Sequence, residues 1–518
     1  MSNYLKQAIE INEEFRKALD VMENTDKNVF LTGKAGTGKS TLLDYFRENT
    51  KKRVIVLAPT GVAALNVKGE TIHSFFGFKP DITIHKVKKI GKKNEIYKKT
   101  KVIIIDEISM VRADLLDCVD KFLRLNGKSP SLPFGGAQMI FIGDLYQLPP
   151  VVTSKEKQLF ETYYSSPYFF DSRVMKELSY EFLELDKIYR QKDNVFIDVL
   201  NGIRNNSIKD EQFQLLNSRA EAHHAHPANS FRITLTTTND LASRINQEHL
   251  NGLAAPLHSF MGEITGEFDR AYCPTEIELK IKPGAQVMLL NNDPSGRWVN
   301  GTIGEVKAIK RKEGVDVHVV KLRGGETVEV KPYTWEIFHF RYDETRGRIE
   351  SETAGAFRQY PLRLAWAVTI HKSQGKTFEN VNVDFGRSVF ACGQAYVALS
   401  RCTALGGITL IRPLRRNEVF VDWRIVKFMT ASRYAISEKK MPLEDKIRTI
   451  IEAIDKGASM EIVYLKANDE KSRRVIKPVD VGRQNYLNKE FIGVEAYCTK
   501  RKENRMFRID RILEMKLI

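Results

Sequence analysis

The octet Gly33 to Ser40, GKAGTGKS, is the part of the chain whose residue types and spacing most clearly predict chemistry. It follows the apolar run NVFL and precedes a helix-like stretch, which is the strand, loop and helix setting of a phosphate-binding loop. Its glycines allow a tight turn whose N–H groups point at phosphate oxygens, and the start of the helix adds positive charge. We predict that Lys39 reaches the β and γ phosphates and that the Ser40 hydroxyl binds Mg²⁺. The sequence therefore predicts a nucleoside triphosphate site formed by Gly33, Ala35, Gly36, Thr37, Gly38, Lys39, Ser40 and Thr41.

An acidic pair and a polar loop follow two further apolar runs that we expect to be strands. Asp106 and Glu107 come after VIII, and Asp144 and Gln147 come after QMIFIG. A triphosphatase needs a carboxylate that holds the metal and a second group that orients or deprotonates water. We predict that Asp106 holds Mg²⁺, that Glu107 activates the attacking water, and that Gln147 senses the γ-phosphate at the carboxyl edge of the sheet. The alternative is that the acidic pair is an ordinary strand end.

The composition indicates a globular protein with an anionic partner. The chain has 518 residues, 42% hydrophobic and 28% charged, and its formal net charge is +16. At roughly 150 residues per domain, this length predicts three or four domains. A basic surface concentrates phosphate polymers, so nucleic acid is the expected partner. The densest basic run, from Lys79 to Lys101, holds nine lysines against Asp81 and Glu95, although such runs are also typical of solvated faces.

The sequence does not support other classes of protein. No run approaches the roughly 18 apolar residues of a membrane span. The first residues, MSNYLKQAIEINEEFRK, lack the apolar core of a signal peptide, so we expect a cytoplasmic protein with no membrane partner. The five cysteines lack CxxC spacing and are expected to be reduced thiols without a zinc site. His223, His224 and His226 fall in EAHHAHPANS, which we interpret as a surface loop rather than a metal site.

Alternating strand-like and helix-like runs predict two parallel-sheet lobes. From residue 28 to about 185, the runs NVFLTG, RVIVLAPT, KVIIIDE and QMIFIGD alternate with helix-like segments, which is typical of a sheet covered on both faces. The pattern recurs in FRITLTTT, in a helix near 239–250, and then in LRLAWAVT, VNVDF, AYVALS and GITLIRP. We assign residues 1–185 to a first lobe, with a lysine-rich excursion at about 62–100, and residues 186–251 and 360–432 to a second.

Two further units are predicted outside the lobes. In residues 252–359, closely spaced strands separated by Gly and Pro predict a small antiparallel barrel inserted into the second lobe. Residues 433–445, which include SEKKMPLED, are predicted to be a linker. Residues 446–518 have a helix-like start and then strands with partial alternation, which predicts a separate β-rich module. This module has 17 basic against 11 acidic residues, a net charge of +6, and its candidates for phosphate contact or solvated surface are Arg473, Arg474, Arg505 and Arg508.

A set of motifs occurs in one order along most of the chain. They are GKAGTGKST, APTGVAAL, TIHSFFG, IIDEISM, GDLYQLPPV, KIYRQ, TTTN, KPGAQVMLLNN, VNGTIG, LAWAVTIHKSQGKTF and AYVALSRC. In order and spacing they resemble the superfamily 1 DNA helicases of the petite-integration-frequency (Pif) type, over roughly residues 10–430. The resemblance implies an α/β fold with two RecA-like lobes and an inserted SH3-like β-barrel, in an enzyme of DNA replication and repair. The tail resembles a WYL domain through IVYL, RRVIKPVDV and RMFRIDRI, although Glu490-Phe491-Ile492 replaces the naming tripeptide.

The resemblance also implies roles for individual residues. Arg190 of KIYRQ and Arg401 of ALSRC would reach the γ-phosphate from the second lobe, for which a planar, permanently charged guanidinium is suited; both can instead be surface arginines. Gly375 would contact the nucleotide. The family's DNA contacts map to Pro59, Thr60, Gly61, His73, Phe75, Asn239, Thr369, His371 and Lys372. Their hydroxyl, amide and N–H groups suit phosphates, and their aromatic rings suit base stacking, although Phe75 can instead pack in the core.

One position departs from the family pattern. The family usually places an adenine-binding glutamine upstream of the phosphate loop, in a phrase like LNEEQ, and the matching phrase here is INEEF. Phe15 therefore stands at the glutamine position, where it either stacks on the base or faces the core. Preference for adenine is accordingly less certain than triphosphate hydrolysis.

We therefore expect an ATP-dependent DNA helicase that uses Mg²⁺ with ATP. The resemblance alone implies 5′ to 3′ movement along single-stranded DNA, with forked or structured DNA as substrate, and a monomer is expected. Alternate closing and opening of the lobes would drive stepping, the excursion would act as a wedge, and the barrel would cover the bound strand. Two alternatives stay open, namely a translocase that strips proteins from DNA and a DNA-binding ATPase regulator controlled by the WYL-like tail.

Overall fold

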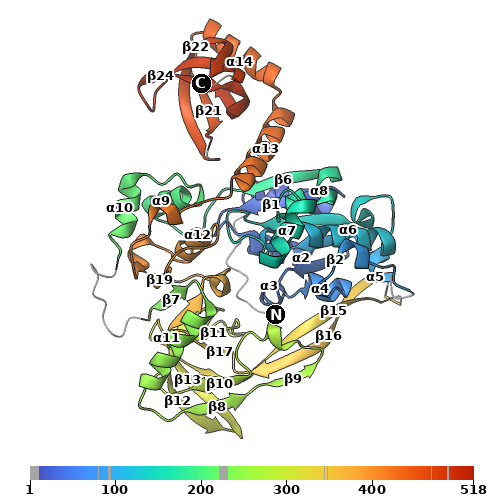
Figure 1. The fold of residues 1–518 in the computed structure, drawn as a ribbon, viewed down its shortest axis with the longest axis vertical. Helices are drawn as coiled ribbons and strands as arrows, with labels where there is room; N and C mark the ends of the chain where they lie inside the picture. The colour runs from blue at the N-terminus through green and yellow to red at the C-terminus, as the bar shows by residue number, and fades with distance from the viewer. Residues whose placement is uncertain are drawn as a thin grey trace. The chain divides into compact units, whose positions relative to one another are not determined.

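The computed structural model describes residues 11–79, 81–91, 95–152, 154–220, 231–343, 345–346, 348–467, 469–486 and 489–518. His223, His224 and His226 lie outside these residues. The chain forms two compact units, one from Met1–Ile203 with Ile208–Val419 and the other from Arg204–Ser207 with Phe420–Ile518 (Figure 1). Within the described residues, no helix is both long enough and apolar enough to cross a membrane.

The first lobe is built on a six-stranded parallel sheet with strand order β3-β2-β4-β5-β1-β6. Strands β4 and β5 are buried along their whole length because helices cover both faces of the sheet. The strands are β1 (Asn28–Gly33), β2 (Val54–Ala58), β3 (Glu70–Thr71), β4 (Val102–Ile105), β5 (Gln138–Gly143) and β6 (Tyr180–Leu185). The helices are α1 (Glu13–Asn24), α2 (Lys39–Asn49), α3 (Gly61–Asn66), α4 (Ile72–Phe76), α5 (Glu95–Lys99), α6 (Ala113–Asn126), α7 (Ser154–Tyr163) and α8 (Arg173–Glu177).

The second lobe has a four-stranded parallel sheet with strand order β18-β7-β19-β20. Its strands are β7 (Ile233–Thr236), β18 (Ala367–Thr369), β19 (Val381–Asp384) and β20 (Ile408–Leu410). The neighbouring helices are α9 (Asn194–Arg204), α10 (Asp210–Asn217), α11 (Asn239–Gly252) and α12 (Gln394–Leu399). The prediction of an α/β fold with two parallel-sheet lobes is confirmed.

The inserted region contains a five-stranded antiparallel sheet with strand order β14-β13-β12-β11-β17. The strands are β11 (Gln286–Leu289), β12 (Ile303–Lys312), β13 (Val315–Leu322), β14 (Thr327–Val330) and β17 (Leu362–Leu364), and β8 (His258–Met261) pairs with β10 (Glu278–Ile281) nearby. Because β17 pairs with β11, the LRL of LRLAWAVT belongs to this sheet, and the chain re-enters the second lobe only at β18. The prediction of LRLAWAVT as one second-lobe strand was wrong, since apolar residues fill both halves of that run.

A second sheet in the inserted region extends to the first lobe. It joins β15 (Tyr333–Asp343), β16 (Arg348–Gln359) and β9 (Glu263–Gly266) in the order β15-β16-β9. Figure 1 shows the long β15–β16 hairpin ending beside α5, and the Phe340 ring of β15 lies 6.3 Å from the Phe75 ring of α4. A small barrel alone was therefore an incomplete prediction for residues 252–359, because strand alternation gives no sign that a strand will pack on another lobe.

The lysine-rich excursion lies against α6 where the structure describes it. The Lys121 ammonium donates to the Ile84 carbonyl at 2.7 Å. The Asn126 side chain accepts from the Ile90 N–H at 2.8 Å and donates to the Lys88 carbonyl at 3.3 Å. These bonds fasten the backbone of the excursion to the first lobe and leave its wedge role a prediction.

The C-terminal unit contains two helices and a five-stranded antiparallel sheet with strand order β24-β23-β22-β21-β25. Its elements are α13 (Trp423–Lys440), α14 (Leu443–Asp455), β21 (Met460–Leu465), β22 (Lys471–Tyr486), β23 (Lys489–Cys498), β24 (Glu503–Arg508) and β25 (Ile512–Leu517). The predicted linker at 433–445 was wrong, because only Met441 and Pro442 separate α13 from α14. Ser437 of α13 donates to the Leu513 carbonyl at 2.8 Å and accepts from the Lys446 ammonium at 2.7 Å, so this segment is packed structure.

Candidate nucleotide and DNA sites

The phosphate-binding loop connects β1 to α2 and depends on its glycines. Gly36 and Gly38 have φ angles of +82° and +88°, a region that favours glycine. A side chain at Gly36 would bring its Cβ within 2.5 Å of the Arg190 Cβ, and one at Gly38 would come within 3.0 Å of the Phe15 ring. The loop can therefore adopt this shape, with neighbouring groups close against it, only with glycine at both positions.

The loop lines a cavity of about 410 Å³ together with residues from the second lobe. Lys39 lies along the loop, and its ammonium donates to the carbonyls of Gly33 at 2.7 Å and Lys34 at 3.0 Å. The predicted residues that line the cavity are Ala35, Gly36, Thr37, Gly38, Lys39, Ser40, Thr41, Glu107, Gln147, Arg190, Gly375 and Arg401. The structure thus brings together residues that are far apart in the sequence.

Asp106 and Glu107 follow β4 and form a crowded acidic pair. Glu107 has a left-handed backbone with φ of +50°, and Asp106 is buried. Burial raises the pKa of both carboxyl groups, the charge of Glu107 raises that of Asp106 further, and the Lys39 ammonium lowers both. A divalent cation would relieve this crowding, and carboxylate and hydroxyl oxygens such as those of Asp106 and Ser40 are the type of donor that Mg²⁺ prefers. Ser40 lines the cavity, whereas Asp106 is not among its lining residues.

Gln147 lies in a loop that contacts α12 of the second lobe. Its amide Nε2 donates to Asp144 Oδ2 at 3.3 Å, and its own N–H donates to the Asp144 carbonyl at 3.0 Å. A Cβ on Gly393, the residue before α12, would come within 2.4 Å of the Gln147 carbonyl oxygen. The start of α12 is therefore in close contact with the loop that holds Gln147.

The two predicted arginines lie together at the second-lobe side of the cavity. Arg190 Nη1 donates to the Ser400 carbonyl at 3.2 Å. Arg401 is 2% exposed, and its guanidinium donates from Nε to the Val397 carbonyl at 3.0 Å and from Nη2 to Ser400 Oγ at 3.0 Å. Burial lowers the pKa of Arg401, and the Arg190 charge lowers it further. An anion between these groups would be strongly attracted.

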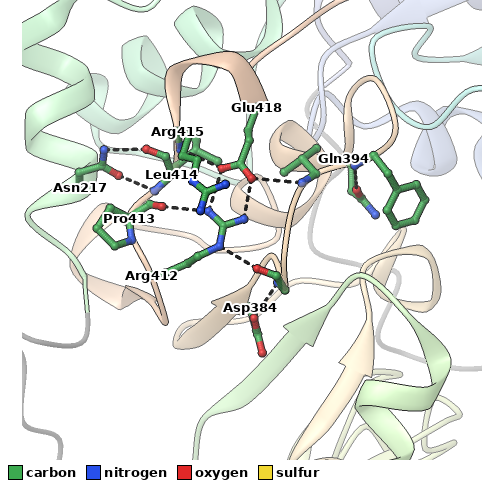
Figure 2. Close-up of polar contacts among 11 residues, drawn as sticks. Asn217, Asp384, Gln394, Arg412, Pro413, Leu414, Arg415 and Glu418 are labelled. Carbon is green, nitrogen blue, oxygen red and sulfur yellow. Dashed lines mark hydrogen bonds and ion pairs between the residues drawn. The ribbon is translucent and has the colours of Figure 1, made fainter.

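A buried ion pair fastens the segments on either side of α12. Figure 2 shows Arg412, which donates to both carboxylate oxygens of Glu418, at 2.8 and 2.6 Å, and to the Gly386 carbonyl at 2.8 Å. Glu418 also accepts from the N–H groups of Val389 at 3.3 Å and Arg415 at 2.9 Å. The chain entering α12 and the chain following β20 are thus joined at one carboxylate.

The predicted DNA residues cluster where helices begin after parallel strands. Thr60 caps α3 after β2, Asn239 is the first residue of α11 after β7, and the Thr369 hydroxyl at the end of β18 accepts from the Lys372 N–H at 3.3 Å. Pro59, Gly61 and His371 adjoin these residues in sequence. N–H groups at helix starts are suited to phosphate oxygens, and open parallel sheets bind ligands beyond their carboxyl edges.

His73 and Phe75 of α4 differ in how far they are exposed. His73 is half-buried, and burial lowers its pKa, so its imidazole is neutral near pH 7. Phe75 is 6% exposed, with its ring 4.9 Å from Phe76, 5.2 Å from Tyr97 and 6.3 Å from Phe340. The prediction that Phe75 stacks on DNA bases does not fit this packing, because neighbouring rings cover it.

Phe15 is likewise a core residue. It is 3% exposed, belongs to the hydrophobic core of the first lobe, and lies beneath Gly38. Of the two alternatives for this position, the structure supports packing in the core. Phe15 therefore offers no group that could recognise adenine.

Sequence reasoning missed three residues at the cavity. Tyr189 and Thr377 line it, and the Tyr396 hydroxyl of α12 accepts from the Ala35 N–H of the phosphate loop at 2.9 Å. Tyr189 could have been found from its place next to Arg190 in KIYRQ. Nothing in the helix-like run AYVALS indicates that one of its side chains reaches the first lobe.

The candidate phosphate contacts of the C-terminal unit are mostly paired. Arg473 lies 2.6 Å from Glu461, Arg505 3.7 Å from Glu503, and Arg508 2.6 Å from Asp510. Arg474 is 8% exposed and lies over the Phe507 ring, so its side chain is part of the core. The alternative of an ordinary surface is favoured for Arg473, Arg505 and Arg508, and Arg474 fits neither alternative.

Two parallel-sheet lobes whose side chains meet over a phosphate loop define a nucleoside triphosphatase of the motor class. Residues 10–214 match the family model of the PIF1-like helicase, and residues 445–517 match the WYL domain. The ATP-dependent DNA helicase Pif1 of Bdellovibrio bacteriovorus is 33% identical over 431 residues, which is 81% of this chain and 92% of that protein. The human ATP-dependent DNA helicase PIF1 is 34% identical over 396 residues, 74% of this chain but 58% of its own length.

Solved structures agree with this assignment. The crystal structure of Bacteroides sp Pif1 in complex with ADP-AlF4 has a TM-score of 0.75 at 36% identity and covers 82% of this chain and 97% of that one. Bacteroides Pif1 bound to ssDNA has a TM-score of 0.59 at 35% identity, covering 82% of this chain and 97% of that one. The chain belongs to the PIF1-like helicase family and is an ATP-dependent DNA helicase.

Proposed function

We propose that this helicase hydrolyses ATP in the cavity between its two lobes and thereby moves 5′ to 3′ along single-stranded DNA, unwinding forked or structured DNA. The observation that carries the proposal is the cavity itself, in which Lys39 and Glu107 of the first lobe meet Arg190 and Arg401. Family resemblance alone supports the polarity. A yeast relative named ATP-dependent DNA helicase RRM3, together with a solved Pif1 structure described as a basis for DNA unwinding at forked dsDNA, supports the substrate class.

The residues of the cavity suit phosphoryl transfer. Lys39 would neutralise the β and γ phosphates, and Gln147 would orient the attacking water. As the water oxygen bonds to the γ-phosphorus and the bond to ADP breaks, Glu107 would take the water proton, and the two arginines would stabilise the charge on the γ-phosphate oxygens. Ser40 and Asp106 would hold Mg²⁺, which supplies charge neutralisation at the β and γ oxygens.

Movement would follow from closing the lobes over ATP and opening them after hydrolysis. Thr60 belongs to the first lobe, and Asn239 and Thr369 belong to the second. A change in the spacing of the lobes would therefore change the distance between their contacts with the DNA backbone. The likeness of residues 445–517 to a WYL domain favours a second possibility, in which the C-terminal unit regulates the ATPase.

The test is the ATPase rate against added single-stranded DNA, followed by unwinding of partial duplexes with 5′ or 3′ tails. We expect DNA to stimulate hydrolysis and only 5′-tailed substrates to open, whereas selective opening of 3′-tailed duplexes would contradict the polarity. Stimulated hydrolysis with displacement of bound protein but no unwinding would indicate the protein-stripping translocase. Slow hydrolysis that added DNA does not stimulate would indicate a DNA-binding ATPase regulator. Truncation after Val419, where the first unit ends, would test the C-terminal unit better than a cut inside α13.

A further inference from the structure

Gln191 joins the chain that follows β6 to the segment that carries Arg401. Gln191 is 3% exposed, and its amide Nε2 donates to the carbonyls of Ser400 at 3.1 Å and Cys402 at 2.9 Å. A side-chain amide carries two N–H hydrogens, so it can serve both carbonyls at once. Because Ser400 and Cys402 are the residues on either side of Arg401, Gln191 holds the backbone of Arg401 at both of its neighbours.

The two residues before Gln191 contact the phosphate loop. The Tyr189 N–H donates to the Gly36 carbonyl at 2.9 Å, and a Cβ on Gly36 would come within 2.5 Å of the Arg190 Cβ. Arg190 Nη1 donates to the same Ser400 carbonyl that Gln191 binds. Residues 189–191 therefore form a continuous bridge from the phosphate loop to the segment of Arg401.

The guanidinium of Arg401 is oriented by bonds within the second lobe. It donates to the Val397 carbonyl and to Ser400 Oγ, and its Nη1 lies 3.5 Å from the Lys376 carbonyl. These bonds fix the direction of the guanidinium relative to α12. Its distance from the phosphate loop of the first lobe depends on contacts that reach that loop, and the bridge through Gln191 is one of them.

The position of such a group strongly affects a reaction rate, since a misplacement of about 1 Å can slow catalysis on the order of a hundredfold. We propose that Gln191 is a positioning residue for hydrolysis, which holds the backbone on both sides of Arg401 and so sets where its guanidinium lies in the nucleotide cavity. Gln191 is not among the residues that line the cavity, so it acts through Arg401 rather than on the nucleotide. This inference rests on the proposed function, in which Arg401 acts on the γ-phosphate of ATP.

The experiment removes the two hydrogen bonds and asks whether the effect requires Arg401. Gln191→Met keeps the length of the side chain without its donor, and Gln191→Asn keeps the amide but shortens its reach. We expect each variant to lower the single-turnover rate of ATP hydrolysis, measured with saturating single-stranded DNA, on the order of tenfold. Affinity for ADP, measured by titration calorimetry, should stay within about twofold, because ADP has no γ-phosphate for Arg401 to contact. In an Arg401→Ala background, the same changes at Gln191 should alter the rate by less than about twofold, because residues that act as a unit are not additive.

A matched control is Gln359 of the inserted region, which is also 3% exposed. Its amide Nε2 donates to the carbonyls of Phe260 and Ile277, each at 2.9 Å. Gln359→Met therefore removes comparable bonds away from the cavity and should leave the rate of hydrolysis within about twofold of wild type. Thermal unfolding checks that each variant is folded.

Several results would overturn the inference and leave the proposed function standing. They are an unchanged rate in the folded Gln191 variants, a loss of ADP affinity as large as the loss of rate, a loss of rate that recurs in full in the Arg401→Ala background, and an equal loss in Gln359→Met. Hydrolysis at the wild-type rate by Arg401→Ala would instead refute the proposed role of Arg401, and the positioning role of Gln191 with it.

Discussion

The nucleotide cavity and the predicted DNA-binding face of the first lobe differ in how far other parts of the molecule cover them. The cavity is hollow, and side chains from both lobes point into it. On the DNA-binding face, the inserted region packs directly on predicted contact residues. The ring of Tyr272 lies against Gly61, where a Cβ would come within 2.3 Å of it, and Phe340 packs on Phe75.

A polar contact holds the inserted hairpin on that face. His339 of β15 shares hydrogen bonds with Glu70 of β3 at 2.9 Å and with Glu267 at 3.0 Å, and we name these three side chains the His339 latch. The phosphate loop is backbone of the first lobe itself, whereas Phe75 is covered by Phe340 of the hairpin and Gly61 by Tyr272 of the inserted region. Single side chains should therefore control hydrolysis, and the hairpin contact should control DNA affinity.

The largest effect is expected at the phosphate loop. Lys39→Ala removes the cation that neutralises the phosphates, so it should abolish ATP hydrolysis and unwinding while leaving the melting temperature close to that of wild type. Steady-state ATPase and thermal unfolding measure the two properties. Lys51→Ala, at an exposed lysine of the same lobe, is the control. Normal turnover by the Lys39 variant would place the site elsewhere.

A smaller but still large effect is expected at Arg401. Arg401→Ala should slow hydrolysis on the order of a thousandfold, by comparison with other arginine fingers, and leave nucleotide binding largely intact. Single-turnover hydrolysis and nucleotide titration separate the two effects. A loss confined to DNA affinity would show that Arg401 acts in DNA binding rather than in hydrolysis.

The difference between the two regions also explains how well each could be predicted. The loop residues Gly33 to Ser40 are contiguous, and Glu107 and Gln147 each follow a strand of the same sheet, so sequence order determines where they meet. Phe75 lies on a short helix with apolar neighbours, and no pattern distinguishes a ring that faces DNA from one covered by a distant hairpin. Tyr396 was missed for the same reason, since its partner Ala35 is in the other lobe.

Errors in the fold have a similar origin. The run SEKKMPLED is polar and contains a proline, features shared by a linker and by two helices that meet at Pro442. The packing of Ser437 against the Leu513 carbonyl, which makes this segment part of the C-terminal unit, involves residues 76 positions apart. Contacts between distant residues therefore decide where a unit begins, and local composition does not reveal them.

A change of stability is expected at the carboxylate that holds the segments flanking α12. Glu418 is 4% exposed; burial raises its pKa, but the bonds from Arg412 and from backbone N–H groups outweigh this, and the pKa is lowered overall. Glu418→Gln should lower the free energy of unfolding by about 2 kcal/mol, because it removes a charged partner from a buried pair but keeps one acceptor. Chemical denaturation of the first unit measures this change.

The matched control for Glu418 is Glu379, a carboxylate of the same lobe in an exposed ion pair with Arg323 of the inserted region. Glu379 lies 3.3 Å from Arg323 with 73% of its side chain exposed, so Glu379→Gln should change the free energy of unfolding very little. The pKa of Glu418 is lowered in the folded state. The contribution of Glu418 to the free energy of unfolding is therefore present above the unfolded pKa and is lost as pH falls through the folded pKa. Equal losses of unfolding free energy in the two variants would mean that Glu418 anchors the segments flanking α12 no more strongly than an exposed ion pair does.

The smallest expected effect is the pH dependence of the His339 latch. Burial lowers the pKa of His339, but the bonds to Glu267 and Glu70 outweigh it and raise the pKa above its ordinary value. The latch is therefore fully formed below the unfolded pKa of about 6.5 and weakens as pH rises through the folded pKa. Since the latch holds the hairpin over α4, where Phe340 packs on Phe75, wild-type affinity for single-stranded DNA should improve a few-fold from about pH 6 to pH 8.5 relative to His339→Gln. Fluorescence anisotropy at constant salt measures this ratio, with the exposed His85→Gln as the control that keeps the wild-type profile.

Parallel profiles for wild type and His339→Gln would show that the hairpin does not limit access to the DNA-binding face. The contrast drawn between the two regions would then rest on the nucleotide cavity alone.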